Sequence, residues 1–160
     1  MDPRIIFGNT CNRLMIESLV AAHSGGLARV SSRKLWRARP GDVVVTLGAT
    51  SPKFSAHVAR VLGQREDAVE LVEVGQPVPA LLADAVRADA GASARLSEIA
   101  QRGPIALCPY ALDETTWALA RELGLGVEGY ASTPDARVSE MIHALTLKSG
   151  FRKRARALGL

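Results

Sequence analysis

Short apolar runs alternate with helical patterns along this chain, and that alternation limits the folds that it can adopt. The clearest run, Val-Val-Val-Thr-Leu at 43–47, is rich in β-branched residues and lies between turn residues. Runs at 4–7 and 105–108 are also short, and each is followed by a turn and a helical pattern. Buried strands joined by crossover helices are typical of parallel sheets. The sequence therefore predicts a doubly wound α/β fold in which these three strands lie side by side or nearly so.

The intervals between these runs carry helix signals. Ser51-Pro52 opens one helix, because proline is tolerated in a first helical turn, and Asp113 is a strong capping residue for another. Gly91 indicates a break in an alanine-rich stretch, and Trp36 is expected to pack in the core. Helices are expected at 14–22, 51–62, 81–102, 113–123 and 133–145, and further strands at 27–30, 68–74 and 127–128.

Length and composition limit the class of protein. A chain of 160 residues is long enough for one domain with a sizeable core and too short for two complete domains. No apolar run approaches the roughly 20 residues that cross a bilayer, and the first residues lack the apolar stretch of a signal peptide. Cys11 and Cys108 lie far apart in the sequence, so neither a disulfide framework nor a zinc site is indicated. We expect a cytoplasmic protein with reduced thiols and no membrane partner.

The positive charge is unevenly distributed. The formal net charge is +4, but five of the 20 basic residues lie at 148–156, which leaves 15 against 16 acidic residues elsewhere. Residues 1–60 hold nine of the basic residues and only three acidic ones. A positive surface in this early part favours anionic ligands such as carboxylates or phosphates. Nucleic acid is not an expected partner, because the basic C-terminal cluster has no interleaved aromatic residue beyond Phe151.

The loop after the first run, Gly8-Asn9-Thr10-Cys11-Asn12-Arg13, is the best-placed candidate binding site, since ligands bind beyond the carboxyl ends of parallel strands. Asparagine offers donors and acceptors, and arginine binds carboxylate or phosphate in a forked geometry, so the loop suits the end of an amino acid or peptide. A structural alternative stays open, in which the glycine makes the turn and either asparagine caps the next helix. The predicted substrate-binding residues are Gly8, Asn9, Asn12 and Arg13.

Other chemistries find less support in this loop. The dinucleotide fingerprint needs three glycines and an acidic residue about 20 positions further on, and neither feature is present. Cys11 lies near an expected helix start, but the sequence shows no base partner for it. The three histidines have no spacing typical of metal ligands or of a catalytic triad. The sequence predicts no metal site and no catalytic residue.

The segment 148–160 is basic and amphipathic. Phe151, Ala155 and Leu158 are spaced by four and three positions and share one helical face, while arginine and lysine fill the others. Gly159 indicates the helix end. A helix followed by glycine and an apolar residue usually leads into a further strand. We therefore expect another domain to follow.

Three stretches distributed over the whole chain carry a resemblance. They are Arg4-Ile-Ile-Phe-Gly-Asn-x-x-Asn-Arg13, Leu35-Trp-x-Ala-x-Pro-Gly-Asp-Val-Val-Val45, and Lys148 followed by an aromatic residue, basic residues and Ala157-Leu-Gly-Leu160. In these motifs the chain resembles the N-terminal part of ATP-grasp peptide ligases of the pheganomycin-biosynthesis type. The resemblance implies a three-layer Rossmann-like pre-ATP-grasp domain with a mainly parallel sheet at 1–147. It also implies that 148–160 begin the helix that leads into an ATP-grasp domain.

Such ligases use ATP to phosphorylate a carboxylate, and an amine then displaces the phosphate to form an amide. The resemblance implies that this chain is the substrate-side domain of such an enzyme and is catalytically incomplete alone, with ATP and magnesium bound in the complete enzyme. Lys148 matches a lysine that reaches the nucleotide in related ligases, and the loop 8–13 would hold an amino-acid or peptide substrate. D-alanine ligases place an acidic residue in that loop, and this chain does not, so the identity of the substrate stays open. Whether the chain forms a homodimer also stays open.

Two other functions stay open. The chain could be a freestanding α/β binding or scaffold domain that docks on a separate ATP-grasp protein through its basic C-terminal helix. It could instead be a small nucleotide-binding module, which titration with NADP and ATP would reveal.

Overall fold

The chain divides into two compact units, Met1–Gly129 and Tyr130–Leu160. The computed structural model describes residues 2–10, 12, 30–75, 81–130 and 148–159. The second unit contains the helix α8 (Lys148–Ala157), as the amphipathic pattern predicted. The predicted domain boundary between 147 and 148 borders residues outside the described part, so it stays a prediction.

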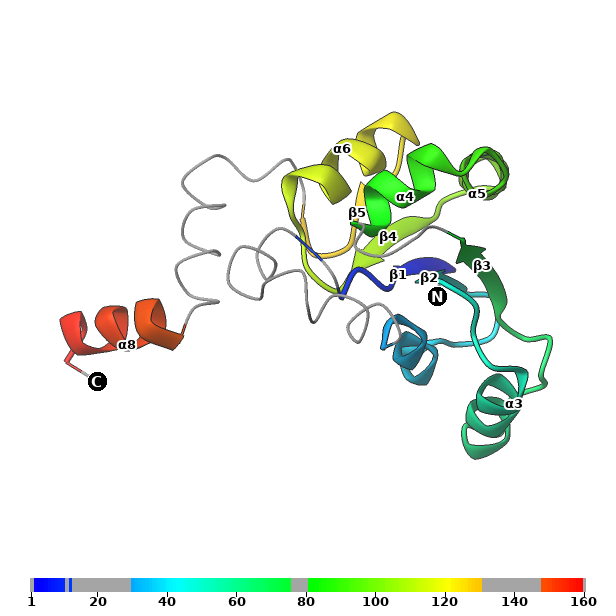
Figure 1. Ribbon diagram of the computed structural model, residues 1–160, viewed down its shortest axis with the longest axis horizontal. Helices are drawn as coiled ribbons and strands as arrows, with labels where there is room; N and C mark the ends of the chain where they lie inside the picture. Colours follow the sequence, from blue (N-terminus) through cyan, green and yellow to red (C-terminus); the bar gives the residue numbers. More distant parts are fainter. Residues whose placement is uncertain (1, 11, 13–29, 76–80, 131–147, 160) are drawn as a thin grey trace. The chain divides into compact units, whose positions relative to one another are not determined.

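The described residues of the first unit form a five-stranded sheet in which every strand is parallel to its neighbours (Figure 1). In the register of the central strands, Ile6 lies opposite Val44 on one side and Cys108 on the other. The predicted doubly wound α/β fold is confirmed, and the three strands predicted to be neighbours are neighbours. In spatial order the strands are β3 (Glu70–Val74), β2 (Val43–Leu47), β1 (Arg4–Phe7), β4 (Ala106–Pro109) and β5 (Gly126–Val127).

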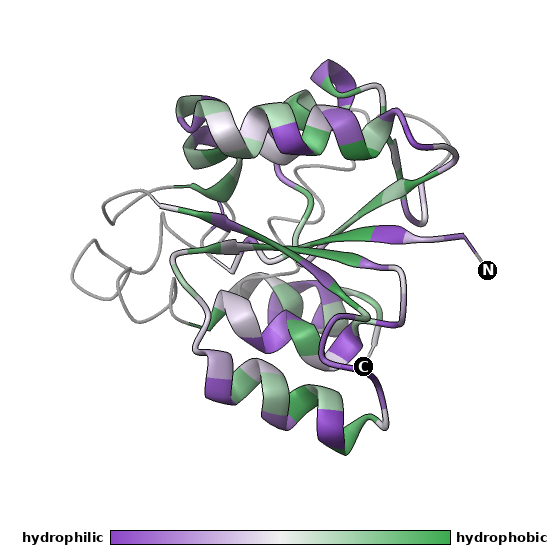
Figure 2. Ribbon diagram, turned by 90° about the vertical axis from the view of Figure 1, so that its right-hand side faces the viewer, coloured by the Kyte–Doolittle hydropathy of each residue, from purple (hydrophilic) through white to green (hydrophobic). Residues whose placement is uncertain are grey.

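Helices cover both faces of this sheet, which gives three layers (Figures 1 and 2). On one face lie α4 (Leu82–Ala88), α5 (Ala90–Ala100) and α6 (Glu114–Glu122). On the other lie the 3₁₀ helix η2 (Ser31–Arg37) and α3 (Pro52–Val61). The strands between them are coloured mainly as hydrophobic in Figure 2, as expected of a sheet buried on both faces.

Successive residues of each strand enter different cores. Ile5 and Phe7 pack under α4, α5 and α6, whereas Ile6 packs with Leu35 and Val58 on the opposite face. This alternation follows from the period of two in a strand, and each fully buried aliphatic or aromatic side chain contributes about 1.5–3 kcal/mol. Burial on both faces therefore favours runs that are apolar at most positions, and such runs can be recognised in the sequence.

Local capping sets two helix boundaries. The Asp113 carboxylate accepts a hydrogen bond from Thr116 N at 2.9 Å, which confirms the predicted cap of α6. Asp89 caps α5 in the same way, accepting from Ala92 N at 3.0 Å. The break in the alanine-rich stretch therefore lies at Asp89, and the prediction that Gly91 marks it is wrong, because a capping carboxylate outweighs a glycine that fits inside the first turn.

The prediction that Trp36 packs in the core is also wrong. Its side chain is 40% exposed and lies edge-on to the rings of Phe54 and His57. In a 3₁₀ helix residues three apart share a face, so Leu35 and Ala38 take the buried face of η2 and the tryptophan is left on the outer one.

Several expected elements lie outside the described residues. They are the helices at 14–22 and 133–145 and most of the strand at 27–30. Among the helices that the structure describes, none has the length and apolar character needed to span a membrane.

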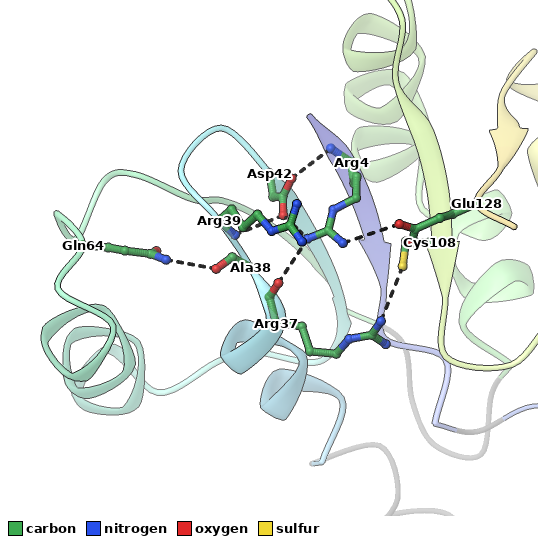
Figure 3. A network of polar contacts seen from close by, with 8 residues as sticks. All are labelled: Arg4, Arg37, Ala38, Arg39, Asp42, Gln64, Cys108 and Glu128. Atoms are coloured by element: carbon green, nitrogen blue, oxygen red, sulfur yellow. Dashed lines mark hydrogen bonds and ion pairs between the residues drawn. The ribbon is translucent and has the colours of Figure 1, made fainter. Parts of the chain in front are cut away.

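An ion pair holds the amino edge of the sheet (Figure 3). The Arg4 guanidinium donates to the Asp42 carboxylate at 2.7 Å, and the backbone N–H groups of Arg4 and Arg39 donate to the same carboxylate at 3.0 Å. The Asp42 side chain is only 3% exposed. This carboxylate thus joins the start of β1 to the turn that precedes β2.

Candidate functional site

The order of strands changes direction between β1 and β4. From β1 the chain continues to β2 and β3 on one side, and it then returns to β4 and β5 on the other. In open α/β sheets, ligands bind at this switch point, beyond the carboxyl ends of the strands. The loops that begin at Gly8 and at Tyr110 leave the sheet there, side by side, because Tyr110 N donates to Phe7 O at 3.1 Å.

Gly8 is required by a close approach of backbones. Its N–H donates to Val45 O at 2.9 Å and so extends the ladder between β1 and β2. A Cβ at this position would lie 2.8 Å from Val45 O and 3.0 Å from Ser31 O, closer than van der Waals contact allows. The glycine therefore lets η2 pack against the end of β1, and the first loop begins from a fixed point.

Asn9 ties the two switch-point loops together. Its Nδ2 donates to Ala111 O at 2.5 Å and to the Thr116 hydroxyl at 3.0 Å. Its Oδ1 accepts from the backbone N–H groups of Tyr110 at 2.9 Å and Ala111 at 3.2 Å. The side chain is buried, and both donors and both acceptor positions of the amide are in use. Asn9 thus builds the frame of the site, and its predicted contact with substrate stays a prediction.

Asn12 supports the same loop from within. It is fully buried, and its Nδ2 donates to Asn9 O at 3.0 Å. Within the described part of the chain, its Oδ1 has no hydrogen-bond donor. Whether either asparagine also caps the expected helix at 14–22 is not tested, since that segment, like Cys11 and Arg13, lies outside the described residues.

Two cations of η2 point toward the loop and strand on the far side of the switch point. Lys34 Nζ lies 3.4 Å from the centroid of the Tyr110 ring, and Arg37 Nη2 lies 3.9 Å from Cys108 Sγ. Burial lowers the pKa of the Lys34 ammonium, and the nearby Arg37 lowers it further. Sequence reasoning missed this pair. The run of cations at 33–39 with no acid among them was the available signal, but nothing local linked it to Tyr110.

The Cys108 thiol lies where this cluster meets the network of Figure 3. Burial raises the pKa of Cys108 to about 11, and the neighbouring Glu128 carboxylate acts in the same direction. A hydrogen bond with the thiol lowers the pKa of Glu128, and Arg4, 3.6 Å away, lowers it further. A thiol that stays protonated at neutral pH is a poor nucleophile, so Cys108 is a packing residue and a weak hydrogen-bonding group.

A cavity of about 330 Å³ opens at the opposite, amino edge of the sheet. Its walls are mainly apolar, and the guanidinium of Arg102 on its rim is already paired with Glu70 at 3.0 Å. It lies away from the switch point and brings together no reactive groups. The carboxyl edge is therefore the stronger candidate site.

No group of three or more histidine, cysteine or acidic side chains in the described part of the chain could hold a metal ion. Lys148 is the first residue of α8 and lies in the second unit, so its predicted contact with a nucleotide is not tested.

The sequence was matched by the model of one known protein family. The model of the pre ATP-grasp domain family matches residues 31–125, which is more than half of the chain. The chain belongs to the pre ATP-grasp domain family. A search of curated proteins gave no match.

The matched residues of this pre-ATP-grasp domain include most of the switch-point site. They run from the start of η2 to the residue before β5, and so contain Lys34, Arg37 and Tyr110. The first loop, with Gly8 and Asn9, lies before the matched residues. Membership associates the chain with ATP-grasp ligases in general terms and leaves the reaction and the substrate to be proposed.

Proposed function

We propose that this chain is the substrate-side domain of an ATP-dependent carboxylate–amine ligase of the peptide-bond-forming, pheganomycin type. The family match over residues 31–125 carries the proposal. The resemblance of the motifs at 4–13, 35–45 and 148–160 supports the narrower assignment to peptide ligases. In this proposal the chain acts together with an ATP-grasp domain, which is its partner whether on the same polypeptide or on another.

The proposed division of labour follows from the chemistry of the described residues. ATP supplies the phosphoryl group that activates the substrate carboxylate, and the ATP-grasp domain would hold ATP and magnesium. The chain's own part is to bind and orient the amino-acid or peptide substrate at the switch point. The support for this is the rigid frame of the first loop, in which Gly8 closes onto β2 and Asn9 joins the loops after β1 and β4.

The experiment that tests this proposal uses the chain together with the ATP-grasp domain that its gene or a neighbouring reading frame encodes. ADP release is measured with amino acids and peptides as carboxylate and amine substrates. We expect ADP release only when the chain, the ATP-grasp domain and both substrates are present. ADP release that needs no amine, or that the chain does not affect, would contradict the proposal.

Variants of the predicted site residues sharpen this test. Arg13→Ala should raise the KM for the amino-acid or peptide substrate and leave that for ATP nearly unchanged, because the first loop faces the substrate. Lys148→Ala should instead weaken the use of ATP, by about 1.5–3 kcal/mol for a charged hydrogen bond. Asn12→Ala should have the same effect on KM as Arg13→Ala, and its thermal unfolding is measured to show that the buried loop still forms. If both loop variants behave as the wild type with every substrate, the loop has only a structural role.

A further inference from the structure

The 3₁₀ geometry of η2 places two cations in one row. Residues three apart eclipse one another in such a helix, so Lys34 and Arg37 share a face and their backbones lie on the order of 6 Å apart. On β4 and the residue after it, Cys108 and Tyr110 also share a face, because side chains alternate along an extended strand. Lys34 contacts Tyr110, just after β4, and Arg37 contacts Cys108 within β4, so the row begins at the switch point and runs back along β4.

Neither cation forms a close ion pair with a carboxylate in the part of the chain that the structure describes, although Glu128, which contacts Arg4 at 3.6 Å, also interacts electrostatically with Arg37. The contacts of Lys34 and Arg37 are an aromatic ring and a thiol. Other cations of this domain are paired with acids. Arg4 contacts Asp42 and Glu128, Arg87 contacts Asp84 and Glu122, Arg95 contacts Glu70 and Glu98, and Arg102 contacts Glu70.

Placing these two positive charges close together costs free energy. Lys34 is partly buried, and both its burial and the nearby Arg37 disfavour its charged form. The ring of Tyr110 offsets part of this cost through its negative face. An anion between the two cations would remove the rest, because it would neutralise a repulsion that the folded domain otherwise retains.

We propose that Lys34 and Arg37, held beside Tyr110 at the switch point, form a binding site for the oxyanion of a small ligand, a carboxylate or a phosphate. The guanidinium of Arg37 has five N–H donors in a rigid fork, of which the structure uses one on the Cys108 sulfur, so an edge remains for two parallel hydrogen bonds. Lys34 adds a point charge from one turn away. In the proposed ligase the ligand would be the carboxylate of an amino-acid or peptide substrate, and only this last assignment rests on the proposed function.

The test is an NMR titration of the whole chain at constant ionic strength. The probes are N-acetylglycine, its uncharged amide and inorganic phosphate, and the readout is the ring signals of Tyr110 and Tyr130. We expect the two anions to shift the signals of Tyr110 and not those of Tyr130, and the amide to shift neither. Tighter binding of N-acetylglycine assigns the site to a carboxylate, and tighter binding of phosphate assigns it to a phosphate ligand.

Variants within η2 separate a built site from diffuse charge. Lys34→Gln should weaken anion binding at least about tenfold, as expected for the loss of a charged hydrogen bond. Arg33→Gln is the matched control, because it removes one positive charge from the next residue, on the outer face of η2, and it should change binding by less than roughly twofold. The amide spectrum of each variant shows whether the domain is folded.

Three results would overturn the proposal. One is an equal shift of Tyr110 by the uncharged amide, another is equal weakening by Arg33→Gln and Lys34→Gln, and the third is no shift at anion concentrations well above millimolar. Because the titration needs neither ATP nor an ATP-grasp domain, its failure is distinct from failure of the ligase assay.

Discussion

Charged side chains at the two edges of the sheet differ in their partners. At the amino edge, Asp42 accepts hydrogen bonds from a guanidinium and from two backbone groups, and Glu70 contacts both Arg95 and Arg102. Toward the carboxyl edge, Lys34 contacts the Tyr110 ring and Arg37 contacts the Cys108 thiol, and neither forms a close ion pair in the described part of the chain, although Glu128 interacts electrostatically with Arg37. Buried charges are stable when they are paired and hydrogen-bonded. Charge at the amino edge therefore stabilises the fold, whereas the proposed anion site would use the charges of Lys34 and Arg37 to bind a ligand.

The largest expected effect is at the amino edge. Asp42→Ala should lower the free energy of unfolding by about 3 kcal/mol, because it leaves Arg4 nearly buried without its main partner. Asp67→Ala is the control, since it breaks an Arg–Asp contact of nearly the same length, 2.8 Å, between exposed side chains, and it should change stability little. Equal effects of the two variants in urea unfolding would remove the distinction between the edges.

The frame of the carboxyl edge should show the next largest effect. Asn9→Ala should cost about 2 kcal/mol, because it removes all four hydrogen bonds of the amide and leaves Ala111 O and the buried Thr116 hydroxyl without their partner. Gln64→Ala removes a single hydrogen bond to Ala38 O and should cost about 1 kcal/mol or less. Both variants are measured by thermal unfolding. If Asn9→Ala loses no more stability than Gln64→Ala, the two loops do not depend on the hydrogen bonds of Asn9.

Acid should weaken the amino edge through Glu70. Burial raises the pKa of Glu70, but its hydrogen bonds with Arg95 and Arg102 outweigh burial and hold the pKa below its ordinary value of 4.5. A lowered folded-state pKa stabilises the fold above the ordinary value, and this stabilisation is lost as the pH falls through the folded-state pKa. Glu70→Gln should therefore cost about 1 kcal/mol at pH 7, and its difference from the wild type in urea unfolding should shrink below pH 4.5. A difference that does not change with pH would mean that the carboxylate charge plays no part.

The smallest effect, and the sharpest test of the comparison, is at Lys34. Lys34→Met should leave stability unchanged or raise it by about 0.5 kcal/mol, because it removes a partly buried charge beside Arg37. In the anion titration the same variant should lose binding. A loss of stability above about 1 kcal/mol would show that this lysine, like Asp42, serves the fold.

Local signals account for the parts of the structure that sequence reasoning predicted. The strand at 43–47 is apolar at four of its five positions because it is buried on both faces, and Asp113 caps a helix through a hydrogen bond to a residue three positions away. Two local signals for a helix break lie close together at Asp89 and Gly91. The prediction used the glycine, whereas the capping carboxylate of Asp89 sets the helix start. The exposure of Trp36 follows from the 3₁₀ geometry of η2, which no local signal in the sequence predicted.

The sequence by itself determined the fold class and the positions of the described strands, because these depend on residue periodicity and on short-range turn and cap chemistry. The site at the carboxyl edge stays a prediction. Only the tertiary structure decided what the residues there do. Asn9 forms a hydrogen bond with Ala111, 102 residues further on, and Lys34 contacts the ring of Tyr110 on the far side of the switch point. Such contacts follow from the packing of strands and crossover helices that are distant in the chain, and no local pattern encodes them.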